Sequence, residues 1–230
     1  LKRILDDMFL DDCVDLIEEM PANVVQRVMR NSSAENRKLI NQYLQYPEDS
    51  AGSLMTNEYV CLKQGMTVAD ALAAIRRDGV DKETIDNCYV VSPDRRLEGE
   101  VTLRQLVLSD PAAPITELMD DNVHSCHTHD DEEQIAQAFT HYDLLAMPVV
   151  DNENRLVGII TIDDAVDVIQ EENTEDFEIM AGMAPSEDTY LKTPVLTLAK
   201  NRIVWLLVLM LSAMVTGALL QHYEAAIAAL

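Results

Sequence analysis

The sequence predicts an α/β (α+β) fold with four successive parts: a helical N-terminal bundle fragment, two tandem copies of a small α/β unit, a long acidic connecting helix and one C-terminal transmembrane helix. Three observations lead to this prediction. A segment of about 60 residues occurs twice. An acidic stretch without any basic residue follows the second copy, and a long uncharged apolar run lies near the end of the chain. These features indicate several structural parts rather than one uniform core.

The first 46 residues have the pattern of short helices. Val14, Ile17 and Met20 recur at intervals of three, which places them on one face of a helix. Ser32 and Glu35 have the spacing of a capping box that opens a later helix. Residues 1–46 therefore predict part of a small helical bundle.

The duplicated unit occupies residues 52–111 and 115–170. Tyr89–Val107 aligns without gaps on Pro148–Val166, and Leu54-Met55-Thr56 corresponds to Leu118-Met119-Asp120. The identical pairs of the long alignment are Val90/Val149, Val91/Val150, Arg96/Arg155, Leu97/Leu156, Gly99/Gly158, Thr102/Thr161 and Val107/Val166. Each copy predicts a strand, a helix and a β-hairpin that leads into another helix. Two such copies would bury their faces against each other in one module.

The connecting segment, residues 163–190, is strongly acidic. No Lys or Arg lies between Arg155 and Lys192. At 100° per residue several of its acidic side chains share an arc of about 80° on a helix; these are Asp164, Asp167, Glu171, Glu175 and Glu178. The opposite face holds Ala165, Val168, Ile169 and, less regularly, Phe177.

Two interpretations of this acidic stripe remain open. A run of charge is usually a solvated helix face, although such faces normally alternate positive and negative residues. Like charges at i,i+4 each cost about 0.2–0.5 kcal/mol, so a stripe without counter-charge favours a bound cation. Carboxylate ligands without Cys or His favour a hard ion such as Mg²⁺ or Ca²⁺.

Residues 200–222 predict a transmembrane helix. Ile203–Leu220 contains no charge, and only Ser212 and Thr216 are polar. At 1.5 Å per residue this run reaches about 27 Å, close to the hydrocarbon thickness of a bilayer. A buried core helix would normally show a polar stripe. Lys192, Lys200 and Arg202 precede the run, so the positive-inside rule places its N-terminal side in the cytoplasm.

Composition argues against other classes of function. The chain has 41 acidic and 17 basic residues, a net charge of −24, and no basic cluster that could neutralise nucleic-acid phosphates. Its four cysteines are scattered, without CxxC spacing, and predict reduced thiols. No phosphate loop, nucleophile elbow or HExxH motif occurs, so we do not expect an enzyme.

A zinc site is an alternative in the second copy. Its candidate ligands crowd within one short segment: His124, Cys126, His127 and His129. The segment occupies a strand position, where successive side chains point to opposite faces. Because at most two ligands would share a face, we expect an exposed strand rather than a zinc site.

These motifs carry a resemblance to known families. The repeat, with its Leu-Met-Thr start and its PVVDNENRLVGIITIDD hairpin, resembles a tandem pair of CBS domains. The strings YPEDSAGSLMT (Tyr46–Thr56) and ENTEDFEIMAG (Glu172–Gly182), before an apolar helix, resemble the MgtE-type magnesium transporters. The resemblance covers essentially the whole chain. It implies an N domain, a CBS pair, a connecting plug helix and the first of five transmembrane helices in each subunit of a homodimer.

The resemblance also implies regulatory Mg²⁺ ligands. In the second CBS copy they fall on Asp131, Glu133 and Asp143; on the connecting helix they fall on Asp164, Asp167, Glu172, Glu175 and Asp176. The N-domain ligands are expected at Asp11 and Asp15, which have i,i+4 spacing. CBS pairs often bind adenine nucleotides through Thr-x-x-Asp, which makes ATP a second candidate ligand at Thr161, with Arg104 near its phosphates. The first copy has Thr102-x-x-Gln105 and is degenerate in this motif.

The resemblance thus implies a cytosolic Mg²⁺ sensor and gate of a homodimeric magnesium channel or transporter. Mg²⁺ would be both regulatory ligand and transported ion. We expect a multi-pass protein of the plasma (inner) membrane, with residues 1–200 in the cytoplasm. One alternative is an adenine-nucleotide-sensing CBS module of another membrane protein. Another is a magnesium- or cobalt-efflux accessory protein, in which membrane helices usually precede the CBS pair.

Overall fold

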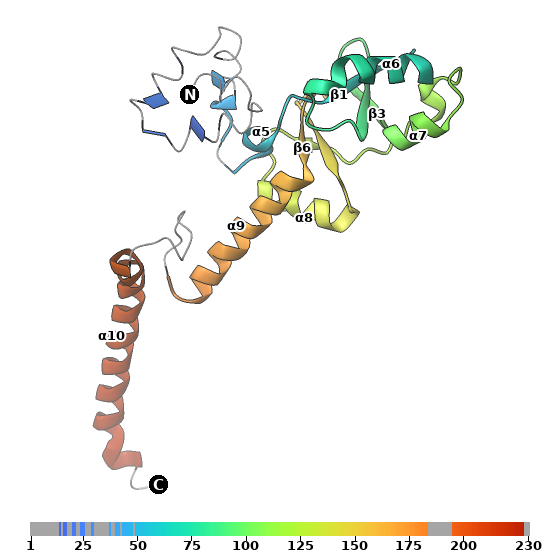
Figure 1. Cartoon of the computed structure of the whole chain (residues 1–230). Helices are drawn as coiled ribbons and strands as arrows, with labels where there is room; N and C mark the ends of the chain where they lie inside the picture. Colours follow the sequence, from blue (N-terminus) through green and yellow to red (C-terminus); the bar gives the residue numbers. More distant parts are fainter. Residues whose placement is uncertain are drawn as a thin grey trace. The chain divides into compact units, whose positions relative to one another are not determined.

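The computed structural model describes residues 49–183 and 195–227, together with individual positions between 14 and 47 (Figure 1). The chain forms two compact units, Leu1–Ile169 and Gln170–Leu230. The first unit contains two three-stranded sheets with associated helices. The predicted mixture of helices and small sheets is therefore confirmed.

The first copy of the repeat forms the sheet β1-β2-β3. Its elements are β1 (Val60–Lys63), α6 (Val68–Asp78), η1 (Gly79–Asp81), β2 (Asn87–Val91), β3 (Leu97–Thr102) and α7 (Leu103–Leu108). β1 pairs with β2 in parallel, and α6 makes the crossover between them. The α6 helix begins where Thr67 and Asp70 form a capping box, which satisfies two backbone N–H groups at the start of the helix.

The second copy repeats this topology in the sheet β4-β5-β6. Its elements are η2 (Ile115–Glu117), β4 (Cys126–His127), α8 (Glu132–Tyr142), β5 (Ala146–Val150) and β6 (Leu156–Thr161). The register shifts at Val90/Val91 in one hairpin and at Val149/Val150 in the other. These are equivalent positions of the alignment, so the predicted internal repeat is confirmed, and the structure adds that the two hairpins share a β-bulge.

The two copies exchange the segments that precede their first strands. α5 (Ala51–Leu54) leads into Met55, which occupies the space beside Gly158 of the second copy. The amide of Thr56 donates to the carbonyl of Ile159 (2.7 Å), and the reverse bond is 2.8 Å. A Cβ at Gly158 would lie 2.6 Å from Met55 Sδ, which explains why this position needs glycine.

The reciprocal exchange involves Met119 of the second copy and Gly99 of the first. A Cβ at Gly99 would lie 2.7 Å from Met119 Sδ. Glu100 and Asp120 exchange two backbone hydrogen bonds of 2.9 Å. Each copy thus completes its packing with a segment that belongs to the other in sequence.

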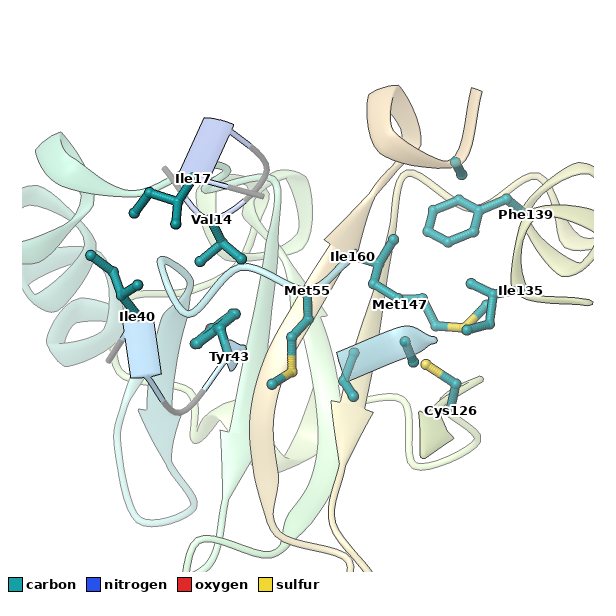
Figure 2. Packing of buried hydrophobic residues seen from close by; sticks show 13 residues of the cluster. Val14, Ile17, Ile40, Tyr43, Met55, Cys126, Ile135, Phe139, Met147 and Ile160 are labelled. Carbon is teal, nitrogen blue, oxygen red and sulfur yellow. The ribbon is translucent and has the colours of Figure 1, made fainter. Parts of the chain in front are cut away.

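A hydrophobic cluster holds the second copy together. Figure 2 shows Met55, Met147 and Ile160 near Ile135 and Phe139 of α8. Four described helical positions of the N-terminal region are buried members of the same cluster: Val14, Ile17, Ile40 and Tyr43. Their burial agrees with the predicted helical stripes of residues 1–46.

α9 (Ile162–Met180) begins directly after β6 and crosses from the first unit into the second. Ala165 and Val168 are buried, as the predicted apolar face requires. The helix ends at Met180, because Gly182 adopts φ 67° and its amide donates to the carbonyl of Ile179 (2.9 Å). The helix is therefore shorter than the predicted connecting segment 163–190, whose last residues lie outside the described part.

α10 (Val195–Ile227) contains the predicted transmembrane segment. Val195–Tyr223 is long and apolar enough to cross a membrane, and none of it is buried within the structure. An exposed helix that is apolar on every side is typical of a membrane span.

Candidate functional site

The candidate ligands of the second CBS copy lie at opposite ends of α8. Asp131 is the N-cap residue, and its Oδ1 accepts a hydrogen bond from the amide of Gln134 (3.2 Å). Asp143 is the C-cap residue, in the left-handed conformation with φ 53°. Twelve residues of helical rise separate them by about 18 Å, so they cannot bind one ion together. Glu133 lies in the first turn, where its Oε1 accepts from Gln137 Nε2 (3.0 Å).

The C-terminal end of α8 adjoins the start of α9. The amide of Ile162 donates to the carbonyl of Leu145 (3.0 Å), which brings the loop after Asp143 beside the first turn of α9. In that turn the hydroxyl of Thr161 donates to Asp164 Oδ2 (2.7 Å). Asp143, Asp164 and the exposed Asp167 therefore belong to the same end of the second copy.

The acidic stripe of α9 is partly as predicted. Asp167, Glu171 and Glu175 are exposed and share one arc of the helix. Glu172 and Asp176, by contrast, are turned about 80° and 120° away from Asp164, so the candidate ligands occupy two faces.

Two assignments on the C-terminal half of α9 were wrong. Glu178, expected on the solvated stripe, is only 6% exposed, whereas Phe177, expected on the apolar face, is 69% exposed. The physical reason is that α9 leaves the CBS core after Ile169. Glu178 and Phe177 belong to the second unit, whereas the buried Ala165 and Val168 belong to the first.

The residues present fit Mg²⁺ as separate sites of low protein coordination. Among the described residues, no group of three or more His, Cys, Asp or Glu side chains is arranged to hold a metal. Mg²⁺ commonly keeps several waters and takes only one or two carboxylates from the protein. Asp131, Asp143 and Asp167 each offer such an oxygen at the surface. Asp11 and Asp15 lie outside the described residues.

The candidate zinc ligands do not lie close together on one face. Cys126 is buried in β4, while His127 is exposed and His124 stacks on Tyr142, with ring centroids 3.9 Å apart. Burial raises the pKa of the Cys126 thiol to about 12, so the thiolate that zinc requires is disfavoured. The expected strand, with Cys126 and His127 on opposite faces, accounts for this segment.

The nucleotide candidates occupy equivalent positions in the two copies. The hydroxyl of Thr161 donates to Asp164 Oδ2 (2.7 Å) at the start of α9, and the hydroxyl of Thr102, the N-cap residue of α7, donates to Gln105 Oε1 (2.8 Å). Gln105 therefore keeps the local geometry of the motif, although its Nε2 also donates to the carbonyl of Leu118 (3.3 Å). Arg104 is exposed.

Residues that no motif of the sequence marks join the two copies. Arg95, with φ 64°, donates to the hydroxyl of Tyr59 and to the carbonyl of Leu156, both at 3.2 Å. Glu100 is half-buried there, and burial raises the pKa of its carboxyl group. Pattern analysis does not identify these contacts, because the partners are up to 61 residues apart in sequence.

No motif of the sequence marks the attachment of the Asp131 turn either. Ser50 and Asp131 form an antiparallel bridge, and the amide of Ala51 donates to the carbonyl of Asp130 (2.8 Å). A candidate ligand of the second copy is thus held by the segment that follows the N-terminal helices.

Comparisons with known proteins agree with this architecture. Residues 1–49 match the family model of the MgtE intracellular N domain, and residues 51–110 and 115–171 match that of the CBS domain. The chain is 38% identical over 224 residues to the magnesium transporter MgtE of Thermus thermophilus, covering 96% of this chain and 50% of that protein. It is 34% identical over 223 residues to MgtE of Bacillus subtilis, covering 97% and 49%. The chain spans about half the length of these relatives.

Two solved structures are similar to this chain. One is the cytosolic domain of the Mg²⁺ channel MgtE in complex with ATP, with 40% identity, a TM-score of 0.70, and coverage of 73% of this chain and 68% of that one. The other is the soluble part of a magnesium transporter, with 34% identity, a TM-score of 0.72, and coverage of 74% and 67%.

The fold and the matched segments define a CBS-pair protein with an MgtE-type N domain and an apolar helix at its C-terminal end. The chain belongs to the MgtE family of magnesium transporters.

Proposed function

We propose that this chain is the cytosolic Mg²⁺-sensing and gating region of a homodimeric magnesium channel or transporter of the inner (plasma) membrane. The observation that carries the proposal is the exposed row of carboxylates on α9, between Arg155 and Lys192, where the sequence contains no basic residue. The names of the relatives that match most of the chain, MgtE of Thermus thermophilus and of Bacillus subtilis, support transport rather than catalysis.

The proposed gating is electrostatic. Asp164, Asp167 and Glu175 repel one another and any acidic surface that approaches α9, which favours separation of the parts. Bound Mg²⁺ supplies positive charge that allows acidic surfaces to come together. Residues 1–46, the second CBS copy and α9 all carry candidate ligands, including Asp11 and Asp15. When these acidic surfaces are held together, the pore would be closed. When they separate, the pore would open. Because each ion keeps several waters, the affinity should be modest.

Limited proteolysis of the full chain in detergent tests this function. Millimolar Mg²⁺ should protect the bonds near Glu172–Gly182, whereas KCl of equal ionic strength should not. The variant Asp164→Asn with Asp167→Asn removes two charges, while the amide oxygen of Asn at position 164 can still accept the hydrogen bond of the Thr161 hydroxyl. Folding should therefore survive and protection should weaken. Asp94→Asn, at an exposed turn of the first copy, is the matched control. If KCl protects the same bonds equally well, the acidic stripe is only a solvated helix face.

An adenine-nucleotide ligand is the second candidate. The observation that favours it is the equivalent Thr cap in both copies, together with the ATP-bound relative. Titration calorimetry with ATP alone and with Mg²⁺ alone separates the two functions. A nucleotide sensor is supported if ATP binds and if Arg104→Ala and Thr161→Val weaken that binding. An ion sensor is supported if Mg²⁺ alone gives a heat of binding.

A further inference from the structure

The turn that ends α9 lies against a tryptophan of α10. A Cβ at Gly182 would lie 2.7 Å from Trp205 Nε1 and 2.8 Å from its Cγ, so the backbone of Gly182 is in direct contact with the indole ring. Gly182 also has φ 67°, a conformation that residues with a side chain rarely adopt. Both residues belong to the second unit of the chain. The end of α9 is thus attached at a defined position on α10, and this attachment requires glycine.

Trp205 marks the depth of this contact in a membrane. It is the third residue of the uncharged run Ile203–Leu220, and Lys200 and Arg202 come just before that run. Tryptophan is enriched at the membrane–water interface, and basic residues on the same side indicate the cytoplasmic leaflet. The end of α9 therefore lies at the level of the cytoplasmic headgroups when α10 spans the membrane.

The last turns of α9 expose large apolar side chains near this level. Phe177 and Met180 are 69% and 82% exposed, and their i,i+3 spacing places them on one face of the helix. Phe177 is five residues before Gly182, so helical rise separates the two by only about 7.5 Å. Amphipathic helices bind to bilayers by burying an apolar face about 5–10 Å into the interface. Phe177 and Met180 are therefore within reach of the lipid that surrounds Trp205.

The acidic side chains of the same turns lie on another face. At 100° per residue, Glu175 lies about 160° from Phe177, and Glu171 lies about 120° from it. Both carboxylates are exposed, so they can stay in water while the apolar face enters the interface. No Lys or Arg lies between Arg155 and Lys192, so anionic headgroups find no positive charge on α9. Burial of apolar side chains must therefore provide the binding, and a bilayer without net charge suits it best.

We infer that the C-terminal end of α9 is an interfacial membrane anchor, in which Phe177 and Met180 bind between the headgroups and the acyl chains of the cytoplasmic leaflet. The contact between Gly182 and Trp205 sets the depth of this anchor. The bilayer is favoured over a second copy or a soluble partner, because the turn beside this apolar face already contacts the apolar helix α10. The inference rests on one part of the proposed function, the membrane span of α10.

Quenching of tryptophan fluorescence by brominated lipid tests the anchor. Trp205 is the only tryptophan of the chain, so Trp205→Phe gives a silent background that keeps an aromatic ring beside Gly182. Phe177→Trp is made in this background, and the chain is reconstituted into phosphatidylcholine vesicles whose acyl chains are brominated near the headgroup. The indole at position 177 should be quenched about twofold or more. Val166→Trp, at another exposed apolar position of α9, is the matched control and should not be quenched.

A second measurement avoids the membrane affinity of an introduced indole. Phe177→Ser with Met180→Ser keeps Trp205 and removes the apolar face. In the vesicles, hydrogen exchange of the amides of residues 176–183 should become about fivefold faster or more. Ile179→Ser, at an exposed position about 160° from Phe177, is the matched control and should leave the exchange unchanged. Equal exchange in the serine pair and the wild type would contradict the anchor.

The outcomes separate the inference from the proposed function. In the unsubstituted chain the brominated lipid should quench Trp205 itself. If Trp205 is quenched but the indole at position 177 is not, the inference is wrong and the membrane span stands. The inference is also wrong if that indole emits at shorter wavelength without being quenched, because protein rather than lipid then covers it. If Trp205 is not quenched, the membrane span and the anchor are both wrong.

Discussion

Replacing Met55 with alanine is expected to destabilise the second CBS copy, although Met55 precedes the first copy in sequence. Met55 is 1% exposed and packs beside Gly158, in the hydrophobic cluster of the second copy. Thr56, its neighbour, pairs with Ile159 through two backbone bonds. Loss of the side chain therefore opens a cavity at the sheet β4-β5-β6.

The magnitude follows from burial. A fully buried Met→Ala change costs about 2–5 kcal/mol, because it removes apolar contacts and leaves a cavity that relaxes only partly. Single domains are stable by about 5–15 kcal/mol, so this loss is a large fraction of the total. Met55→Leu conserves volume and should cost less than about 1.5 kcal/mol. Met119→Ala, at the equivalent but less buried position, should cost less than Met55→Ala.

Urea unfolding followed by circular dichroism measures the total loss, and native-state hydrogen exchange shows where it falls. The amide of Ile159 should exchange faster in Met55→Ala, while amides of β2 should be nearly unaffected. A loss below about 1 kcal/mol would contradict the exchange of segments described above. Faster exchange confined to the sheet β1-β2-β3 would contradict it as well.

Three further outcomes are expected. Phe139→Ala, which removes a 1% exposed side chain from α8, should cost about 3–5 kcal/mol in urea unfolding, whereas the exposed Gln137→Ala should cost little. Burial raises the pKa of the Glu100 carboxyl group above 4.5, so the protonated form stabilises the fold and this stabilisation is lost as pH rises through the folded-state pKa. Glu100→Gln should therefore be more stable than the wild type at pH 7 and equal to it below pH 4. Urea midpoints measured across this pH range would show the difference. Burial raises the pKa of the Cys88 and Cys126 thiols to about 12, so iodoacetamide at pH 8 should label them only after unfolding; rapid labelling of the native chain would contradict their burial.

The candidate Mg²⁺ site could be predicted from the sequence only as a set of residue types. The resemblance placed Asp131 and Asp143 in the second copy and Asp164 on the connecting helix, and the structure shows where each lies. That Asp131 and Asp143 are at opposite ends of α8 follows from helix length alone. Which carboxylates approach one another across separate parts of the chain depends on packing that no local pattern encodes, and it stays a prediction.

The sequence by itself determined the repeated α/β unit and the apolar helix. These features depend on periodicity and on contacts between residues a few positions apart, which a sequence displays directly. The gap-free alignment of the two hairpins agrees with the equivalent positions of their bulges in the structure.

Only the tertiary structure decided how distant segments meet. Three features depend on residues that lie far away in the chain. They are the exchange of Met55 and Met119 between the copies, the contact of Gly52 with the Asp131 turn, and the burial of Glu178. A helix pattern states which residues share a face, but burial of that face depends on what packs against it. α9 shows this within one helix: Ala165 and Val168 of its apolar face are buried in the first unit, whereas in the second unit Glu178 is buried and Phe177 is exposed.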